Sequence, residues 1–178
     1  MLCYYIMAFR PNLIFKKLTG SGKNEVTDEY NKIVSYLTKS VFKSNTDTTD
    51  SELNTVGKKL FGSEFGGVYP EDAKVQFDKR HSYYIFNTDK ASGGGVHWLG
   101  IYVDHTTKSV YVFDTFDRET SKLVPDLYVD IKHNHFRIRK GAHHIHQKDC
   151  QLSCGQRSIA YLILVKKFGI KKVMDSNF

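Results

Sequence analysis

The segment that most constrains the fold lies near the C-terminus, at residues 154–168 (CGQRSIAYLILVKKF). Its apolar residues occur on nearly every side at helical spacing, so a helix here must be covered by other elements all around. Two lysines stand in its last turn, and Gly169 supplies the residue at which helices commonly end. Ser153 and Gln156 have the spacing of a capping box, which predicts that the helix starts at Cys154.

β-rich runs follow one another from residue 82 onward. Residues 82–87 are predicted to form one strand, and the runs 96–103 and 109–114, separated by a short polar turn, predict a β-hairpin. Further strands are predicted at 135–139 and 143–147. Together with the buried helix, these runs predict an α+β fold in which a mixed sheet packs on that helix.

The first 50 residues are interpreted as an accessory region. Apolar residues at helical spacing, with acidic residues near the start and lysines near the end, predict an amphipathic helix over 25–43. The polar run 44–50 is interpreted as a linker, and a short helix is predicted over 51–61. We therefore divide the chain into an N-terminal helical region, 1–50, and a main domain, 51–178.

The composition, 40% hydrophobic and 25% charged, is typical of a folded globular protein. The apolar start is too short to cross a bilayer and lacks the basic region and cleavage site of a signal peptide. No later window is long and apolar enough to cross a membrane either. We expect a protein that is neither secreted nor transmembrane. Three cysteines are too few for a disulfide framework, which fits a reducing compartment.

The positive charge is concentrated at one end of the chain. Residues 131–178 hold ten lysines and arginines against two aspartates, a local charge of +8, while residues 1–130 sum to −1. A one-sided basic surface suits phosphate backbones or acidic proteins, and a solvated basic face without a partner explains it equally well.

Cys154 has the position expected of a nucleophile. The first turn of a buried helix presents unpaired N–H groups and the positive end of the dipole, which favour negative charge on a thiol. Gly155 would leave backbone space beside the sulfur for a substrate. An inert buried cysteine at the start of a core helix fits the same position.

A histidine and an acid stand on the two runs of the predicted hairpin. If residues 104–107 form its turn, His97 and Asp114 lie directly opposite each other, with Cβ atoms roughly 4.5–5.5 Å apart. A carboxylate there would hold an imidazole in one tautomer, whereas a slip of one residue would place the two on opposite faces. Gln147, seven residues before Cys154, would add an amide donor for an oxyanion.

These residues resemble a known family. GGVHW (94–98), YVFDTF (111–116) and Gln147-x6-Cys154-Gly155 look like the adenovirus maturation proteases (adenain), with relatives in virophages and polinton-type elements. More distantly, the order of His, acid, Gln and Cys is similar to that of SUMO-specific proteases. The resemblance implies a papain-like cysteine protease with rearranged chain order, in which the buried helix carries the nucleophile.

The resemblance also implies a role for each matched residue. His97 is expected to be the general base, Asp114 its orienting acid where the adenovirus enzymes have glutamate, Gln147 an oxyanion donor and Cys154 the nucleophile. Three further positions are expected to bind substrate: Trp98, Gly95 and Gly155. In such proteases the tryptophan helps to form a narrow channel that favours glycine near the scissile bond.

The implied function is a cysteine endopeptidase that cleaves viral capsid or core precursor proteins during virion maturation, in the virion and the host-cell interior. Members of the family are stimulated by a disulfide-linked viral peptide and by DNA. The sequence requires no cofactor and no metal; neither Cys3 nor Cys150 matches the peptide-linked cysteine, and the basic stretch 132–148 is the candidate DNA contact. The chain also has about 50 residues before the matched region and ends 24 residues after Cys154.

Several alternatives stay open at this point. A SUMO-specific or ubiquitin-like-specific isopeptidase is the nearest one within the protease class. A zinc module is another, with four candidate ligands: His143, His146, Cys150 and Cys154. A third is a nucleic-acid-binding protein with an inert cysteine. Cys150 is the competing nucleophile, but it precedes the helix and is not followed by glycine.

Overall fold

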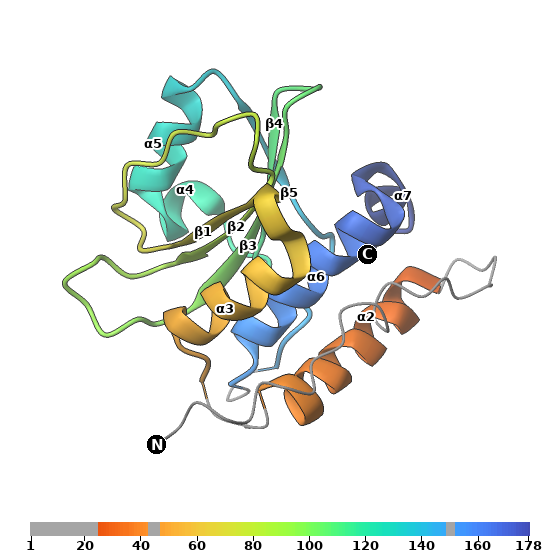
Figure 1. Cartoon of the computed structure of the whole chain (residues 1–178). Coiled ribbons are helices and arrows are strands. Elements are labelled where there is room, and N and C mark those ends of the chain that lie inside the picture. The colour runs from red at the N-terminus through yellow and green to blue at the C-terminus, as the bar shows by residue number, and fades with distance from the viewer. Residues whose placement is uncertain (1–24, 43–46, 149–151) are drawn as a thin grey trace.

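The computed structural model describes residues 25–42, 47–148 and 152–178. Within them, a five-stranded sheet has the strand order β1-β2-β3-β4-β5 (Figure 1). The strands are β1 (Phe65–Tyr69), β2 (Tyr83–Asn87), β3 (Trp98–Asp104), β4 (Ser109–Phe113) and β5 (Arg137–Lys140). The central pairs β2–β3 and β3–β4 are antiparallel, and the outer pairs β1–β2 and β4–β5 are parallel. The predicted α+β fold with a mixed sheet is confirmed.

Helices cover both faces of this sheet (Figure 1). One face carries α6 (Cys154–Phe168), α3 (Asp50–Phe61), α2 (Glu25–Tyr36), which continues as a π-helix over Leu37–Val41, and α7 (Ile170–Asp175). The other face carries α5 (Pro125–His133), which follows the short helix α4 (Thr120–Leu123). Each face has its own hydrophobic cluster, and alternate residues of β2 enter them, Tyr83 and Ile85 on one side and Tyr84 and Phe86 on the other.

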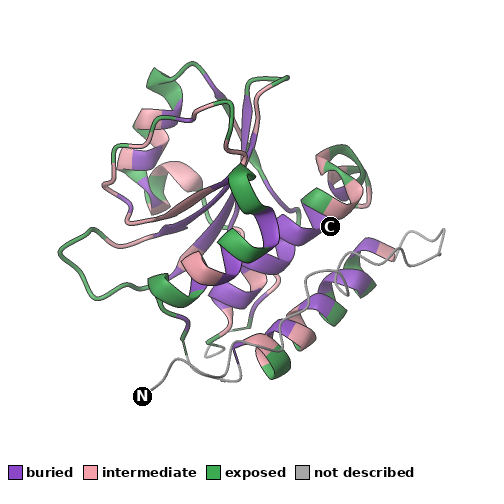
Figure 2. Cartoon of the chain, in the orientation of Figure 1, coloured by how far each residue is buried: buried purple, intermediate pink, exposed green. Residues whose placement is uncertain are grey.

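Helix α6 is the buried helix that its apolar residues predict. Every residue from Ile159 to Val165 is buried, as the continuous purple along α6 in Figure 2 shows. The helix approaches β3 closely at Gly100, where a Cβ atom would come within 3.0 Å of the carbonyl oxygen of Ser158. The Ser158 hydroxyl in turn donates to the carbonyl oxygen of Trp98 at 3.0 Å. These contacts hold the first half of α6 against the start of β3.

The predicted capping box at the start of α6 is wrong. Ser153 makes no side-chain capping hydrogen bond. With φ −122° and ψ 17°, its backbone lacks the extended conformation that aims a capping side chain at the helix. Its hydroxyl oxygen accepts instead from Nε of Arg157 at 2.9 Å. A capping box does occur at α3, where Thr49 and Glu52 cap each other reciprocally.

The hairpin forms, but its register differs from the prediction by two residues. Asp104 pairs with Ser109, so the turn is 105–108 rather than 104–107. The Asp104 carboxylate accepts hydrogen bonds from the backbone N–H groups of Thr106 and Thr107, and Lys108 has φ 51°. These two features determine where the turn begins and ends. Because side chains alternate with a period of two, this even shift leaves His97 and Asp114 on the same face.

Other elements also depart from the predictions. No strand forms at 143–147; the N–H groups of His146 and Gln147 both donate to the carbonyl oxygen of Thr115, which fixes the segment as a loop. The strand predicted at 135–139 is β5, which begins two residues later and ends one residue later. β1, with two glycines in FGGVY, was not predicted, and neither were α4, α5 and α7. The helices predicted over 51–61 and 154–168 are confirmed as α3 and α6.

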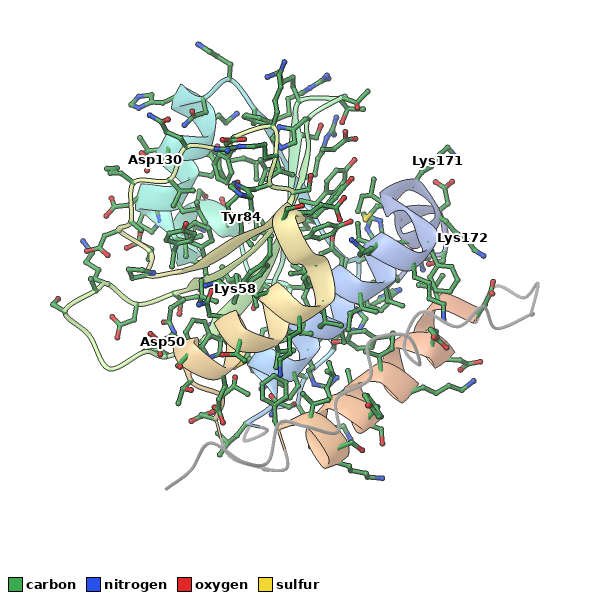
Figure 3. All side chains as sticks on the ribbon, viewed as in Figure 1. Asp50, Lys58, Tyr84, Asp130, Lys171 and Lys172 are labelled. Carbon is green, nitrogen blue, oxygen red and sulfur yellow. The ribbon has the colours of Figure 1, made fainter. Side chains whose placement is uncertain are left out.

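Helix α2 shares the hydrophobic core of the α6 face. Val26, Tyr30 and Ile33 are buried in it. Lys167 forms a buried ion pair with Glu29, and Lys172, labelled in Figure 3, forms a 2.8 Å ion pair with Glu25. The helix predicted over 25–43 is thus observed as far as residue 41. The proposed division of the chain at residue 50 stays a prediction. In the described ranges, no helix is long and apolar enough to cross a membrane.

Candidate active site

The structure brings His97 and Asp114 together at one end of the sheet. His97 directly precedes β3 and Asp114 directly follows β4, and these neighbouring antiparallel strands start and end at the same edge. Nε2 of His97 lies 2.7 Å from Oδ1 of Asp114, and the two side chains are only 5% and 4% exposed. A buried carboxylate at this distance fixes the imidazole orientation and tautomer.

Asp114 accepts hydrogen bonds from several directions. Besides His97, its oxygens accept from the backbone N–H groups of Phe116 (3.3 Å) and Arg118 (2.9 Å). The Arg118 guanidinium adds two more, at 2.9 and 3.1 Å. Burial alone would raise the pKa of Asp114, but the hydrogen bonds from His97 and Arg118 hold it well below its usual range. Asp114 is therefore ionised at neutral pH.

Cys154 is the first residue of α6 and is 6% exposed. Burial is the largest single influence on His97 and lowers its pKa. The hydrogen-bonding and charge interactions with Asp114 and Cys154 together outweigh burial, so the pKa of His97 lies above its ordinary value. Since Nε2 faces Asp114, Nδ1 is the ring nitrogen left for the Cys154 sulfur. The three side chains form one chain of contacts, acid to imidazole to thiol.

Gln147 is connected to the site by hydrogen bonds to Thr115, the residue after Asp114. Its side-chain oxygen accepts from the Thr115 hydroxyl at 2.9 Å, and its backbone N–H donates to the Thr115 carbonyl oxygen at 3.2 Å. Thr115 is fully buried and directly follows Asp114. Because the Thr115 hydroxyl binds the side-chain oxygen of Gln147, the NH2 group of that amide points away from Thr115. An oxyanion requires such an N–H donor.

A cavity of about 540 Å³ opens beside the cysteine. Cys154 and Trp98 line it together with three chain segments: residues 47–50, residues 68–70 and part of the glycine-containing loop 87–96. Asp50, which stands at the start of α3 in Figure 3, belongs to the first of these. Gly95, expected to bind substrate, also lines the cavity and has φ 80°, a conformation that suits glycine.

The backbone space that was expected beside Gly155 is occupied. Gly155 is buried, and a Cβ atom there would lie 1.9 Å from the hydroxyl oxygen of Thr48. The space beside it is therefore filled by Thr48 and is not left for a substrate. Thr48 comes from the segment that was interpreted as a linker, and its backbone carbonyl oxygen accepts from the indole Nε1 of Trp98 at 2.9 Å.

Sequence reasoning missed Thr48, Thr115 and Arg118. Nothing in the polar run 44–50 indicated that Thr48 lies at the site, because the site residues that it contacts, Trp98 and Gly155, are 50 or more positions away in the sequence. Thr115 and Arg118 follow Asp114 closely, so their nearness to the acid was a signal that could have found them.

The alternative metal site receives no support from the described ranges, which contain no group of three or more His, Cys, Asp and Glu side chains able to hold a metal ion. His146 packs between the rings of Tyr30, Phe113 and Phe178 instead. Cys3 and Cys150, the second candidate nucleophile, lie outside the described residues.

A helix-terminal cysteine, a histidine and a buried acid in contact form the arrangement that cysteine hydrolases use. The family model of the adenovirus endoprotease matches residues 65–178 of this chain. The match covers well over half of the chain, so the chain belongs to the adenovirus endoprotease family, as its motifs indicated.

A curated relative from Fowl adenovirus A serotype 1 (strain CELO / Phelps), named "Protease", is 30% identical to this chain over 108 residues. The aligned region is 52% of this chain and 50% of the relative, so the chain spans about half the length of the curated relative it matches.

Proposed function

We propose that this chain is a cysteine endopeptidase with a papain-like arrangement in rearranged chain order. One observation carries the proposal: the buried His97–Asp114 pair contacts Cys154 at the start of a core helix, beside a cavity large enough for several residues of a peptide. Cys154 is the nucleophile, His97 the base and Asp114 the group that orients His97.

The reaction follows from these positions. Nδ1 of His97 takes the thiol proton of Cys154, and the sulfur attacks the carbonyl carbon of the scissile peptide bond. The negative charge on the carbonyl oxygen is stabilised by N–H groups at the start of α6 and by the Gln147 amide. His97 then gives its proton to the departing amine, which leaves a thioester. Water, deprotonated by His97, attacks the thioester and releases the acid and the free thiol.

Asp114 does not exchange a proton in this sequence. Its lowered pKa keeps it ionised throughout, so it stabilises the imidazolium that forms at each step. Gly95 and Trp98 line the cavity together with Cys154. By family resemblance, they bind the substrate backbone and favour small residues such as glycine near the scissile bond.

We further propose that the substrates are viral capsid or core precursor proteins, cleaved during virion maturation in the virion and host-cell interior. The support is the family membership and a relative that is itself a viral protease. A SUMO-specific or ubiquitin-like-specific isopeptidase would use the same residues, and substrate choice distinguishes the two.

DNA is a proposed partner through the basic stretch 132–148. Arg137 and Arg139 are exposed on the same face of the edge strand β5, at the opposite edge of the sheet from β1, which contributes to the cavity. Binding to phosphates there would weaken steeply as salt rises. An activating peptide is a second proposed partner by family resemblance, and neither is required for the chemistry described.

The function is tested by co-expressing the full chain, as wild type or Cys154→Ala, with candidate capsid precursors, and with a ubiquitin-like fusion as a second substrate. Mass spectrometry of the products should show precursor cleavage with the wild type only. Cleavage of the fusion alone would favour the isopeptidase. Equal cleavage by Cys154→Ala would show that Cys154 is not the nucleophile. His97→Ala and Cys150→Ala would then test whether cleavage depends on His97 or on Cys150.

A further inference from the structure

Arg118 donates three hydrogen bonds to Asp114, the acid of the proposed catalytic triad. Its Nε donates to Oδ2 of Asp114 at 2.9 Å and its Nη2 to Oδ1 at 3.1 Å, while its backbone N–H donates to Oδ2 at 2.9 Å. The planar guanidinium thus holds both carboxylate oxygens as a fork, the geometry that makes arginine–carboxylate pairs strong and directional.

The two oxygens of Asp114 have different partners among the described residues. Oδ1 faces Nε2 of His97, with further donation from the backbone of Phe116 and from Arg118. Oδ2 receives its hydrogen bonds from Arg118 alone, through Nε and the backbone N–H. Rotation of the carboxylate about its Cβ–Cγ bond would break both Arg118 hydrogen bonds to Oδ2, so Arg118 keeps Oδ1 directed at the imidazole.

A second contact joins Arg118 to His97. The guanidinium carbon lies 5.0 Å from the centre of the Phe116 ring, and that ring lies 5.2 Å from the His97 ring. The arginine is 43% exposed, whereas the carboxylate it holds is 4% exposed. Phe116 and Arg118 therefore form one wall between the His97–Asp114 pair and solvent.

We infer that Arg118 is a positioning residue for the proposed protease: it fixes the orientation of Asp114 and offsets the charge that Asp114 presents to His97. This inference rests on the proposed function. The titratable groups that face His97 are Asp114, from the turn after β4, and Cys154, from α6; Arg118 stands behind Asp114.

Replacing Arg118 should change the pH at which His97 loses its proton, in a direction that can be stated. Removing the Arg118 charge leaves the full negative charge of Asp114 to stabilise the imidazolium, so the imidazolium should persist to higher pH. A loss of packing alone would lower activity without that displacement. The direction of the pH change therefore separates positioning from a merely structural role.

The test compares Arg118→Gln and Arg118→Lys with a matched control, Arg80→Gln. Arg80 forms the same kind of fork with Asp78, at 3.1, 3.0 and 2.6 Å, but on the exposed loop before β2. For Arg118→Gln we expect kcat to fall by up to about tenfold with little change in KM, because a charge-assisted hydrogen bond to a buried group is lost. Because His97 must be deprotonated to act as the base, the acid limb of its kcat profile should move to higher pH. Arg118→Lys should keep that limb near wild type while losing part of kcat, and Arg80→Gln should change neither.

A second measurement does not depend on activity. The His97 ring is titrated by NMR in the wild type and in Arg118→Gln, after circular dichroism has shown that both are folded; if Arg118→Gln does not fold, Arg118→Met, which also removes the charge, takes its place and is read in the same way. An imidazole that titrates at the same pH in wild type and in Arg118→Gln would overturn the inference, as would the same kinetic change in Arg80→Gln. A wild type without peptidase activity would overturn the proposed function, and the NMR titration would still test the link between Arg118 and His97.

Discussion

The indole Nε1 of Trp98 donates a hydrogen bond to the backbone carbonyl oxygen of Thr48 at 2.9 Å, across 50 positions of sequence. This bond ties the segment before α3 to the start of β3, next to His97. The same threonine fills the space above Gly155, the residue that follows Cys154. One short segment thereby supports both the wall of the cavity and the start of the nucleophile helix.

Replacing Gly155 by alanine should destabilise the protein, although alanine favours helices by about 1 kcal/mol over glycine. The new Cβ would lie 1.9 Å from the Thr48 hydroxyl oxygen, so Thr48 or α6 must move. Overpacking of this kind costs about 1–3 kcal/mol. Chemical denaturation of Gly155→Ala should show a lower free energy of unfolding, and adding Thr48→Gly should recover much of the loss. Two effects that simply add would mean that the residues are not in contact.

Trp98→Phe should weaken substrate binding more than it weakens the fold. The substitution keeps an aromatic ring but leaves the Thr48 carbonyl oxygen without its indole donor. Because residues 47–50 line the cavity, their displacement should raise KM by about three- to tenfold, in line with about 0.5–1.5 kcal/mol for one hydrogen bond. Steady-state kinetics on a peptide substrate measure this change. An unaltered KM together with a large fall in thermal stability would assign Trp98 to the core alone.

Asp114→Asn should remove a pH-dependent part of the stability. The folded pKa of Asp114 is lowered, so its contribution is present above the ordinary aspartate pKa of about 3.9 and is lost as pH falls towards the folded value. Wild-type stability should therefore drop between about pH 5 and the acid limit of folding, and the Asp114→Asn protein should show a shallower drop there. Urea denaturation at several pH values measures both slopes, and parallel slopes would contradict the lowered pKa.

His146→Phe should make the protein less sensitive to mild acid. Burial is the main cause that lowers the pKa of His146 to about 4, and the ring stacks on Phe178 with centroids 4.2 Å apart. The unfolded chain binds a proton at about 6.5, so His146 destabilises the fold as pH falls from there to about 4.

Phenylalanine cannot take up that proton, and Nε2 of His146 has no hydrogen-bond partner among the described groups that would be lost. The His146→Phe protein should therefore keep its melting temperature better between pH 6.5 and 4. His143→Phe, at an exposed position of the same loop, is the control and should behave as wild type. A melting temperature that falls equally in all three proteins would contradict the burial argument.

Much of the fold was predictable because its signals are local. The apolar residues of α6 lie within one helix, and hydrogen bonds between near neighbours place its ends at Cys154 and Gly169. The hairpin was predictable for the same reason, from two β-rich runs and a polar turn. Its register was missed by two residues, because the turn is decided by hydrogen bonds of Asp104 and by a left-handed Lys108 that residue types alone do not indicate.

By itself, the sequence determined the α+β class, the buried helix that begins at Cys154, and the motifs that place the chain in its family. The tertiary structure decided that Thr48 covers Gly155, that Arg118 holds Asp114 and that α2 packs on α6. The physical reason is range: helix and turn formation depend on neighbours within a few residues, whereas these contacts exist only when segments far apart in the chain are packed together.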